Sequence, residues 1–154
     1  MAMKPIIERV DAPGLAAHRV GLTELLVDAV ESGSSVGFVL PLPREEAGEY
    51  WDSLAPSIAG GSRLLWVARD ASGLLGTVQL ELPLKKNGVN RAEVQKLLVH
   101  TRARRNGVAR ALMQTVEARA RELRRGLLFL DTEAGSAAER FYQALAYTCI
   151  GGLP

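Results

Sequence analysis

The sequence is short of cysteine and histidine, and these shortages exclude disulfide-stabilised and metal-binding proteins. Cys149 is the only cysteine, so no disulfide can form within the chain. A lone cysteine is more often a small buried apolar residue than a nucleophile. His18 and His100 lie far apart, and no cysteine or carboxylate cluster has the spacing of metal ligands. No metal site is therefore predicted.

Long apolar runs are also absent. No segment reaches the ~18 apolar residues that a membrane span requires. The N-terminus has no apolar run of signal-peptide length. We therefore expect no membrane partner and a cytoplasmic, reducing location.

Charge is nearly balanced over the whole chain but not along it. The 154 residues carry a net charge of +2, which does not require a nucleic-acid partner. Between Arg102 and Arg125, however, there are eight arginines and only two acids, Glu117 and Glu122. These arginines predict a locally basic face. Because 47% of the residues are apolar and a chain of this length buries roughly 70% of its unfolded surface, we also expect a single globular domain.

Apolar periodicity and turn residues predict the order of the elements. Strands are predicted at residues 6–10, 64–69, 74–82, 91–99, 127–130 and 147–150, and helices at 15–30, 43–58, 108–123 and 137–145. Asp11 is the expected helix cap, and Asn87-Gly88 the expected hairpin turn. Antiparallel strands followed by one parallel β-α-β unit make an α/β (α+β) fold with a mixed, mostly antiparallel sheet. Residues 34–42 form either a loop beside the substrate or ordinary packing.

Residues 91–113 are the part of the chain best suited to binding a ligand. An apolar strand leads into an arginine-rich loop that contains Gly107, and Val108, Leu112 and Val116 then recur at helical spacing. The amides of such a loop and of the helix N-terminus direct positive charge at one place. This arrangement favours an anionic, phosphate-bearing ligand.

Two motifs occur here in the order typical of a known family. Arg104-Arg-Asn-Gly107-Val-Ala109 fits the pattern Arg/Gln-x-x-Gly-x-Gly/Ala, and Phe141-Tyr142-x-x-Leu145-Ala-Tyr147 follows it. They resemble the acetyl-CoA-binding motif and the next helix-and-strand motif of the GNAT N-acetyltransferase superfamily. The resemblance implies acetyl-CoA as co-substrate. It also implies a GNAT-like sheet whose parallel strand pair is splayed, with helices on both faces.

A closer resemblance covers nearly the whole chain. Residues 90–97 (Asn-Arg-Ala-Glu-Val-Gln-Lys-Leu) and 126–136 (Gly-Leu-Leu-Phe-Leu-Asp-Thr-Glu-Ala-Gly-Ser) are similar to acetyltransferases of the tabtoxin-resistance type. This implies acetyl transfer to a primary amine of a small molecule, such as a toxin or an antibiotic. It also implies that the last β-hairpin of the family, beyond the position of Pro154, is lacking, and that the uncovered sheet edge permits a homodimer. Arg105 stands where many relatives have glycine, and we expect this change to do little harm.

The resemblance assigns the donor site largely to backbone groups. Amides of Leu97, Leu98 and Val99 are expected to hold the acetyl carbonyl and the amide arm beside a strand bulge. The alternative is that these are ordinary core residues. The expected pyrophosphate site comprises Arg104, Arg105, Asn106, Gly107, Val108, Ala109 and Arg110. The alternative is a solvated basic turn capped by Asn106.

Glu93 is the candidate for the general base. It matches the strand glutamate that several relatives use, and an alkyl ammonium with a pKa of ~10 must lose a proton before it attacks. Glu93 lies four residues before Leu97, about 13 Å along an extended strand, so a water relay is the natural form. The alternative is a solvent-facing glutamate that pairs with Lys96 or Arg91.

Asp131 and Tyr142 complete the predicted catalytic set. Asp131 ends the parallel strand beside the expected cleft, where it binds the substrate ammonium or shares the base role. Glu133 is a weaker candidate for the same task. Tyr142 matches the family tyrosine that protonates the leaving thiolate. The alternatives are a helix or loop cap at Asp131 and a packing tyrosine at Tyr142.

The leading hypothesis is thus an acetyl-CoA-dependent N-acetyltransferase that acts on a small amine. A second hypothesis is a non-catalytic acyl-CoA-binding or interaction module. A third is a nucleic-acid binder that uses the arginines of residues 102–125. No nucleic-acid partner is expected, because these arginines lack interleaved aromatic residues.

Overall fold

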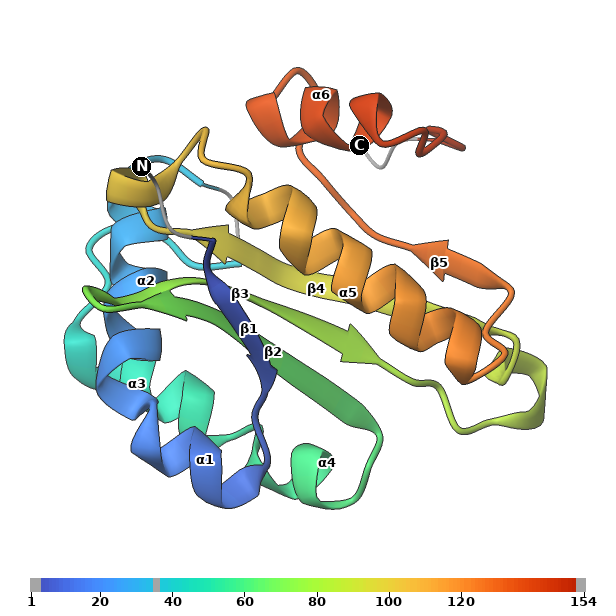
Figure 1. Cartoon of the computed structure of the whole chain (residues 1–154), viewed down its shortest axis with the longest axis horizontal. Helices are drawn as coiled ribbons and strands as arrows, with labels where there is room; N and C mark the ends of the chain where they lie inside the picture. Colours follow the sequence, from blue (N-terminus) through green and yellow to red (C-terminus); the bar gives the residue numbers. More distant parts are fainter. Residues whose placement is uncertain (1–3, 35–36, 152–154) are drawn as a thin grey trace.

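The computed structural model describes residues 4–34 and 37–151 of the chain (Figure 1). Five strands form one sheet in sequential order: β1 (Ile6–Arg9), β2 (Arg63–Asp70), β3 (Gly73–Glu81), β4 (Arg91–Val99) and β5 (Leu127–Phe129). The first three neighbouring pairs are antiparallel, and β4 and β5 are parallel. The predicted mixed, mostly antiparallel sheet with one parallel strand pair is confirmed.

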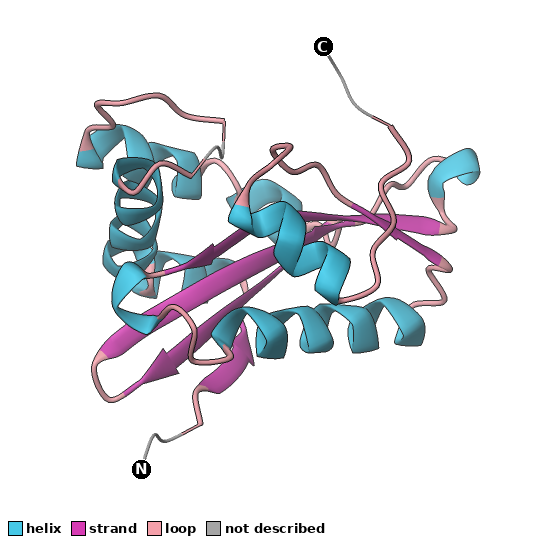
Figure 2. Cartoon of the chain, turned by 90° about the horizontal axis from the view of Figure 1, so that it is seen from above, coloured by secondary structure: helices cyan, strands magenta, loops and turns pink. Residues whose placement is uncertain are grey.

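Helices cover both faces of this sheet (Figure 2). One face carries α1 (Ala12–Ala17), α2 (Arg19–Glu31), α3 (Arg44–Asp52) and α4 (Ala55–Ala59). The other face carries α5 (Val108–Glu122). The last helix, α6 (Ala137–Ala144), follows β5, and its Phe141 packs against the core on the α5 side.

The alternation of side chains along the strands divides the core in two. On β2, Leu65 and Val67 pack with α1 to α3 around the fully buried Trp51. Their neighbours Leu64 and Trp66 point the other way, into a cluster with the apolar side of α5. Each face of the sheet thus has its own apolar core, and the strands are the wall that both share.

Two predicted helices are each divided into a pair. The helix predicted at residues 15–30 begins earlier, where Asp11 accepts a hydrogen bond from the Gly14 amide (2.8 Å), and it is interrupted at His18. The helix predicted at 43–58 is interrupted between α3 and α4, because Pro56 has no amide hydrogen for a continuous helix and fits only a first turn. The cap predicted at Asp11 is confirmed.

Two other predictions about local structure are wrong. Asn87 and Gly88 lie in a 3₁₀ turn (Lys86–Gly88) within a longer connection, and they do not form a two-residue hairpin turn. Residues 147–150 are not a strand. The Tyr147 amide instead donates to the Tyr142 carbonyl (3.0 Å) at the end of α6, which leaves Cys149 exposed where we expected a buried thiol.

Candidate functional site

The candidate site lies beside a β-bulge in β4. The register between β3 and β4 shifts between Thr77 and Gln79, where one residue of β3, Val78, opposes two of β4, Lys96 and Leu97. Lys96 lies in this bulge with a positive φ of 50°. On the other side of β4, pairing with β5 ends at Glu93. Among the described segments, the rest of β4 has no strand on that edge, so the bulge and the splayed strand pair expected from the resemblance are confirmed.

A groove of about 570 Å³ opens where β4 and β5 diverge. Its walls come from the bulged part of β4, the loop after β5, the start of α6 and residues 32–34 and 37. Gly37 therefore places part of the loop predicted at residues 34–42 beside the groove, while residues 35 and 36 lie outside the described part. The predicted site residues that line the groove are Glu93, Leu97, Arg104, Asp131, Glu133 and Tyr142.

Glu93 is half-buried on the groove wall, and its carboxylate is hydrogen-bonded to Gln95. Gln95 Nε2 donates to Glu93 Oε1 (2.9 Å), and Gln95 Oε1 accepts from Arg63 Nη1 (2.7 Å). Neither Lys96 nor Arg91 lies within 4.0 Å of the Glu93 carboxylate as an ion-pair partner. The predicted alternative, a glutamate paired with one of these cations, is therefore wrong.

Gln95 belongs to a polar network that sequence reasoning missed. Arg63, whose side chain is only 14% exposed, donates to Gln79 Oε1 (2.6 Å) and to Glu81 Oε2 (3.4 Å) as well as to Gln95. The fully buried Gln79 donates in turn to the Tyr50 hydroxyl (3.1 Å). The available signal was the period-two placement of polar residues 79, 81, 93 and 95 on two neighbouring strands.

The loop before α5 has the features of an anion site. Gly107 is the N-cap residue with φ 79°, no side chain caps the helix, and its first turn contains no acid. The alternative of a turn capped by Asn106 is therefore wrong. Arg105 also has a positive φ (67°), a conformation that costs a residue with a side chain on the order of 1 kcal/mol. The glycine that many relatives have there would adopt it freely.

The cations around this loop have different partners. Arg104 Nη2 donates to Ser32 Oγ (2.9 Å), and its Nε donates to the Val99 carbonyl (3.3 Å), which keeps it beside the groove. Arg102 Nη2 donates instead to the Leu74 carbonyl (2.7 Å), away from the groove. Arg104 is therefore the better placed of the two to meet a bound phosphate.

His100 lies at the end of β4 with a structural set of partners. Its Nε2 lies 3.7 Å from Asp28 and 3.8 Å from Glu24, and its Nδ1 accepts from the Arg102 amide (3.2 Å). These contacts tie the β4–α5 connection to α2.

Tyr142 contributes both to the groove and to the core. Its ring makes edge contacts with Phe141 (5.3 Å between centroids) and Tyr147 (5.8 Å), while the residue lines the groove. Burial raises the pKa of Tyr142 to about 12, so its hydroxyl stays protonated at neutral pH. Tyr142 is thus a packing residue, as the alternative predicts, and it also lines the groove.

Asp131 is exposed at the groove and caps no helix. The N-cap of α6 is Ser136, whose Oγ accepts from the Glu139 amide (3.1 Å). No described side chain or amide is hydrogen-bonded to the Asp131 carboxylate. The alternative of a cap at Asp131 is therefore wrong, and the carboxylate is open to a ligand.

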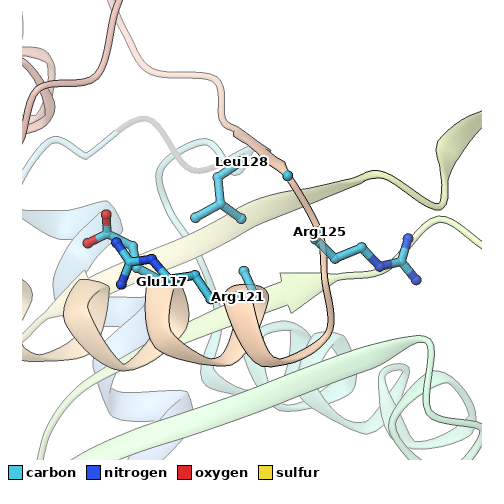
Figure 3. Close-up of a pocket in the computed structure, with 6 residues that line it drawn as sticks. Glu117, Arg121, Arg125 and Leu128 are labelled. Carbon is cyan, nitrogen blue, oxygen red and sulfur yellow. The ribbon is translucent and has the colours of Figure 1, made fainter.

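A smaller hollow of about 150 Å³ lies between α5 and β5 (Figure 3). It contains none of the predicted site residues; its labelled lining residues are Glu117, Arg121, Arg125 and Leu128. The Arg125 guanidinium points away from the other labelled side chains and donates to the carbonyls of Pro83 (3.0 Å) and Gly88 (3.2 Å). Arg125 thus anchors the β3–β4 connection.

Within residues 4–34 and 37–151, no three His, Cys, Asp or Glu side chains are placed to hold a metal ion. In the same residues, no helix combines the length and apolar character needed to cross a membrane. These observations leave the groove beside β4 as the candidate site.

Comparison with known proteins places this groove in context. Residues 35–147 match the acetyltransferase (GNAT) family. Similar solved structures include an aminoglycoside acetyltransferase, meta-AAC0020, from an uncultured soil metagenomic sample in complex with sisomicin, with a TM-score of 0.74, 17% identity and coverage of 97% of this chain and 92% of that one. A transcriptional regulator from Bacillus halodurans C-125 is 22% identical, with a TM-score of 0.73 and 97% coverage of both chains.

A third similar structure is the ribosomal-protein-alanine N-acetyltransferase of Brucella melitensis biovar Abortus 2308. Its TM-score is 0.70 and its identity 20%, over 97% of this chain and 96% of that one. At these identities the structural likenesses establish the fold. These neighbours, an aminoglycoside acetyltransferase, a transcriptional regulator and a ribosomal-protein-alanine N-acetyltransferase, do not share one named role.

Proposed function

Because the chain belongs to the acetyltransferase (GNAT) family, we propose that it transfers an acetyl group from acetyl-CoA to a primary amine of a small molecule. One observation carries the proposal: Glu93, Asp131 and Tyr142 line the same groove, although they come from β4, the loop after β5 and α6. The groove also reaches Arg104, which leads into the uncapped N-terminus of α5. An acid–base set beside an anion site suits acyl transfer from a phosphorylated donor.

The donor site fits acetyl-CoA by the chemistry of the chain alone. The amides of residues 105–109 and the side chain of Arg104 would hold the pyrophosphate, because the first turn of α5 has no acid to compete for them. The amides of Leu97, Leu98 and Val99 would hold the amide arm and the acetyl carbonyl along the unpaired edge of β4. An amide directed at that carbonyl stabilises the negative charge that develops on its oxygen.

The reaction requires one proton to leave the amine and one to reach the sulfur. Glu93 would accept the first through water, since about a thousandth of an alkyl amine with a pKa of ~10 is neutral near pH 7. The new N–C bond forms as the C–S bond of the thioester breaks. Tyr142, whose phenol is neutral at pH 7, would donate a proton to the departing thiolate. Asp131 would bind the incoming ammonium or share the base role.

The class of acceptor is the finer part of the proposal. The similarity of residues 90–97 and 126–136 to tabtoxin-resistance acetyltransferases supports an amine-bearing toxin or antibiotic. The structural neighbour bound to sisomicin supports an antibiotic as one such class. A chain with a single cysteine suits a reducing compartment, and we propose the cytoplasm as the location of the reaction.

The decisive test combines donor binding with turnover. Calorimetry should detect acetyl-CoA binding, and acetyl-CoA consumption should rise with some members of a panel of amino acids, diamines, peptides and aminoglycosides. A folded protein without affinity for acetyl-CoA would refute the proposal. Binding without consumption across the panel would favour the non-catalytic acyl-CoA-binding module.

A matched pair of arginine variants tests the donor site. Arg104→Met should weaken acetyl-CoA binding about 10-fold, the effect of one lost charge-assisted hydrogen bond. Arg102→Met should leave the affinity nearly unchanged, because that guanidinium is bound to the Leu74 carbonyl outside the groove. Equal losses in both variants would contradict the assigned location of the pyrophosphate.

A further inference from the structure

Lys96 places a cation in the groove beside β4. It is the bulge residue of β4, and its positive φ of 50° is one that residues with a side chain rarely adopt. Its ammonium lies 5.7 Å from the centre of the Tyr50 ring, and it lines the same groove as Glu93 and Asp131. Gly37 passes close by, since a Cβ atom added there would lie 3.7 Å from Lys96 Nζ.

This ammonium has no anionic partner among the described residues. No carboxylate of the described residues lies within 4.0 Å of Lys96 Nζ, whereas Arg19, Arg63 and Arg69 each pair with an acid at 2.8 to 3.4 Å. Burial lowers the pKa of Lys96, and repulsion from Arg63 lowers it further, while attraction by Glu93 partly opposes both. A half-buried cation beside another cation is costly unless something negative offsets it.

The groove therefore has two kinds of charge. Glu93, Asp131 and Glu133 are acids on its walls, suited to the ammonium of an acceptor amine. Lys96 is suited to an anion, and the amine itself cannot supply one. A single ammonium matches a singly charged carboxylate better than a phosphate dianion, which needs more donors.

We propose that the acceptor carries a carboxylate that pairs with Lys96, so that amino acids and related zwitterions are the substrate class. This inference rests on the proposed function and narrows it. Polycationic acceptors such as aminoglycosides bring no anion to Lys96 and add positive charge beside it. They should be used poorly, although a structural neighbour was solved with one bound.

Pairs of acceptors that differ only by the carboxylate provide the test. L-Lysine is compared with 1,5-diaminopentane, and L-2,4-diaminobutyrate with 1,3-diaminopropane. Binding to CoA-saturated protein is measured by calorimetry, and kcat/KM by acetyl-CoA consumption. The variants are Lys96→Met, which keeps the chain length without the charge, Lys96→Arg, which keeps the charge, and Lys85→Met, an exposed control in the β3–β4 connection.

The protein should bind and use the amino acid of each pair at least about 10-fold better than the diamine. Lys96→Met should lower kcat/KM for the amino acids about 10- to 100-fold, as expected for one charge-assisted contact, and should not lower it for the diamines, because they bring no anion to Lys96. Lys96→Arg should restore most of the preference, and Lys85→Met should have no effect.

Three results would overturn the inference. The first is an equal kcat/KM for the amino acid and the diamine of each pair. The second is an equal loss of kcat/KM for both in Lys96→Met, which would make Lys96 a base or a structural residue. The third is weaker acetyl-CoA binding in that variant, which would assign Lys96 to the donor. If no amine is acetylated, the proposed function fails, yet binding that depends on both the carboxylate and Lys96 would still support this inference. Absence of that binding as well would refute it.

Discussion

The two faces of the sheet are made by the same strands and are used differently. Toward α5, the strands present a continuous apolar surface of buried side chains: Leu64, Trp66, Val78, Leu80, Ala92 and Val94. Toward α2 and α3, the apolar surface covers only one part, around Leu65 and Val67. The remainder is polar, and there Arg63 donates hydrogen bonds to both Gln79 and Gln95. One face is apolar throughout this region, and the other combines an apolar core with the polar wall of the candidate site.

The polar part of this second face is tolerable because its donors have partners. Arg63 donates from all three guanidinium nitrogens, including a bond from Nε to Ser57 Oγ (3.2 Å). A buried polar group without such a partner would cost about 1–3 kcal/mol. The satisfied network holds Gln95, and through it Glu93, at the edge of the groove. The difference between the faces thus predicts that substitutions on one affect stability and on the other affect turnover.

The largest effect is expected for Glu93→Gln on the polar face. Turnover should fall about 10²- to 10⁴-fold, the range of a lost general base. The free energy of unfolding should change by less than about 1 kcal/mol, because a glutamine oxygen can still accept the bond from Gln95. Steady-state kinetics and urea denaturation measure the two quantities. Glu122→Gln, at the far end of α5 and outside the groove, is the control; a comparable loss of turnover there, or none in Glu93→Gln, would contradict the assignment.

Leu112→Ala tests the apolar face, where we expect a loss of stability and little change in turnover. Leu112 is fully buried between α5 and the sheet, so truncation should lower the free energy of unfolding by about 2–5 kcal/mol. The kcat of the protein that remains folded should change little. Val20→Ala on the surface of α2, where the side chain is 80% exposed, should change stability by no more than about 0.5 kcal/mol. A large loss of kcat in folded Leu112→Ala would show that the faces are not separable in this way.

Tyr142 belongs to both regions, so its titration links them. Burial raises its pKa to about 12, against 10.0 for an ordinary tyrosine. Because the fold favours the neutral phenol, this contribution to stability is complete below pH 10 and is lost as the pH rises towards 12. Linkage gives a loss of about 1 kcal/mol between pH 9 and pH 11.

Urea denaturation at these two pH values measures that loss. In Tyr142→Phe the fall in stability between pH 9 and pH 11 should be smaller by the same amount. Tyr147, whose pKa is also raised to about 12, titrates in both proteins and cancels in the comparison. An identical pH dependence in the two proteins would mean that the Tyr142 hydroxyl is not buried.

The contrast between the faces also explains what the sequence could predict. Apolar strand-forming segments and turn residues located all five strands to within one residue at each end, and the glycine loop before α5 followed from residue order alone. The family resemblance supplied the bulge, because nothing in the local sequence marks Lys96 as a residue with positive φ. The Arg63 network was missed because its members come from β2, β3 and β4, and their contacts exist only after the sheet has formed.

The errors near the C-terminus have a related cause. Residues 147–150 have strand-forming side chains, but Ala146 has φ 70° and the Tyr147 amide is bonded to the end of α6. A strand also needs a partner at the sheet edge, which a local pattern cannot specify. The break between α1 and α2 at His18 was missed for a similar reason, because the apolar residues continue at helical spacing across it.

The smallest expected effect concerns Arg105, in the loop that precedes α5. Its left-handed backbone (φ 67°) favours glycine over any residue with a Cβ atom. Arg105→Gly should therefore be more stable than Arg105→Ala by about 0.5–1 kcal/mol in urea denaturation. Both variants remove the cation, so both should weaken acetyl-CoA binding by the same factor, about 2- to 5-fold for an exposed charge near phosphate. If Arg105→Gly alone kept full affinity, loop conformation and not charge would be the contribution of this position to donor binding.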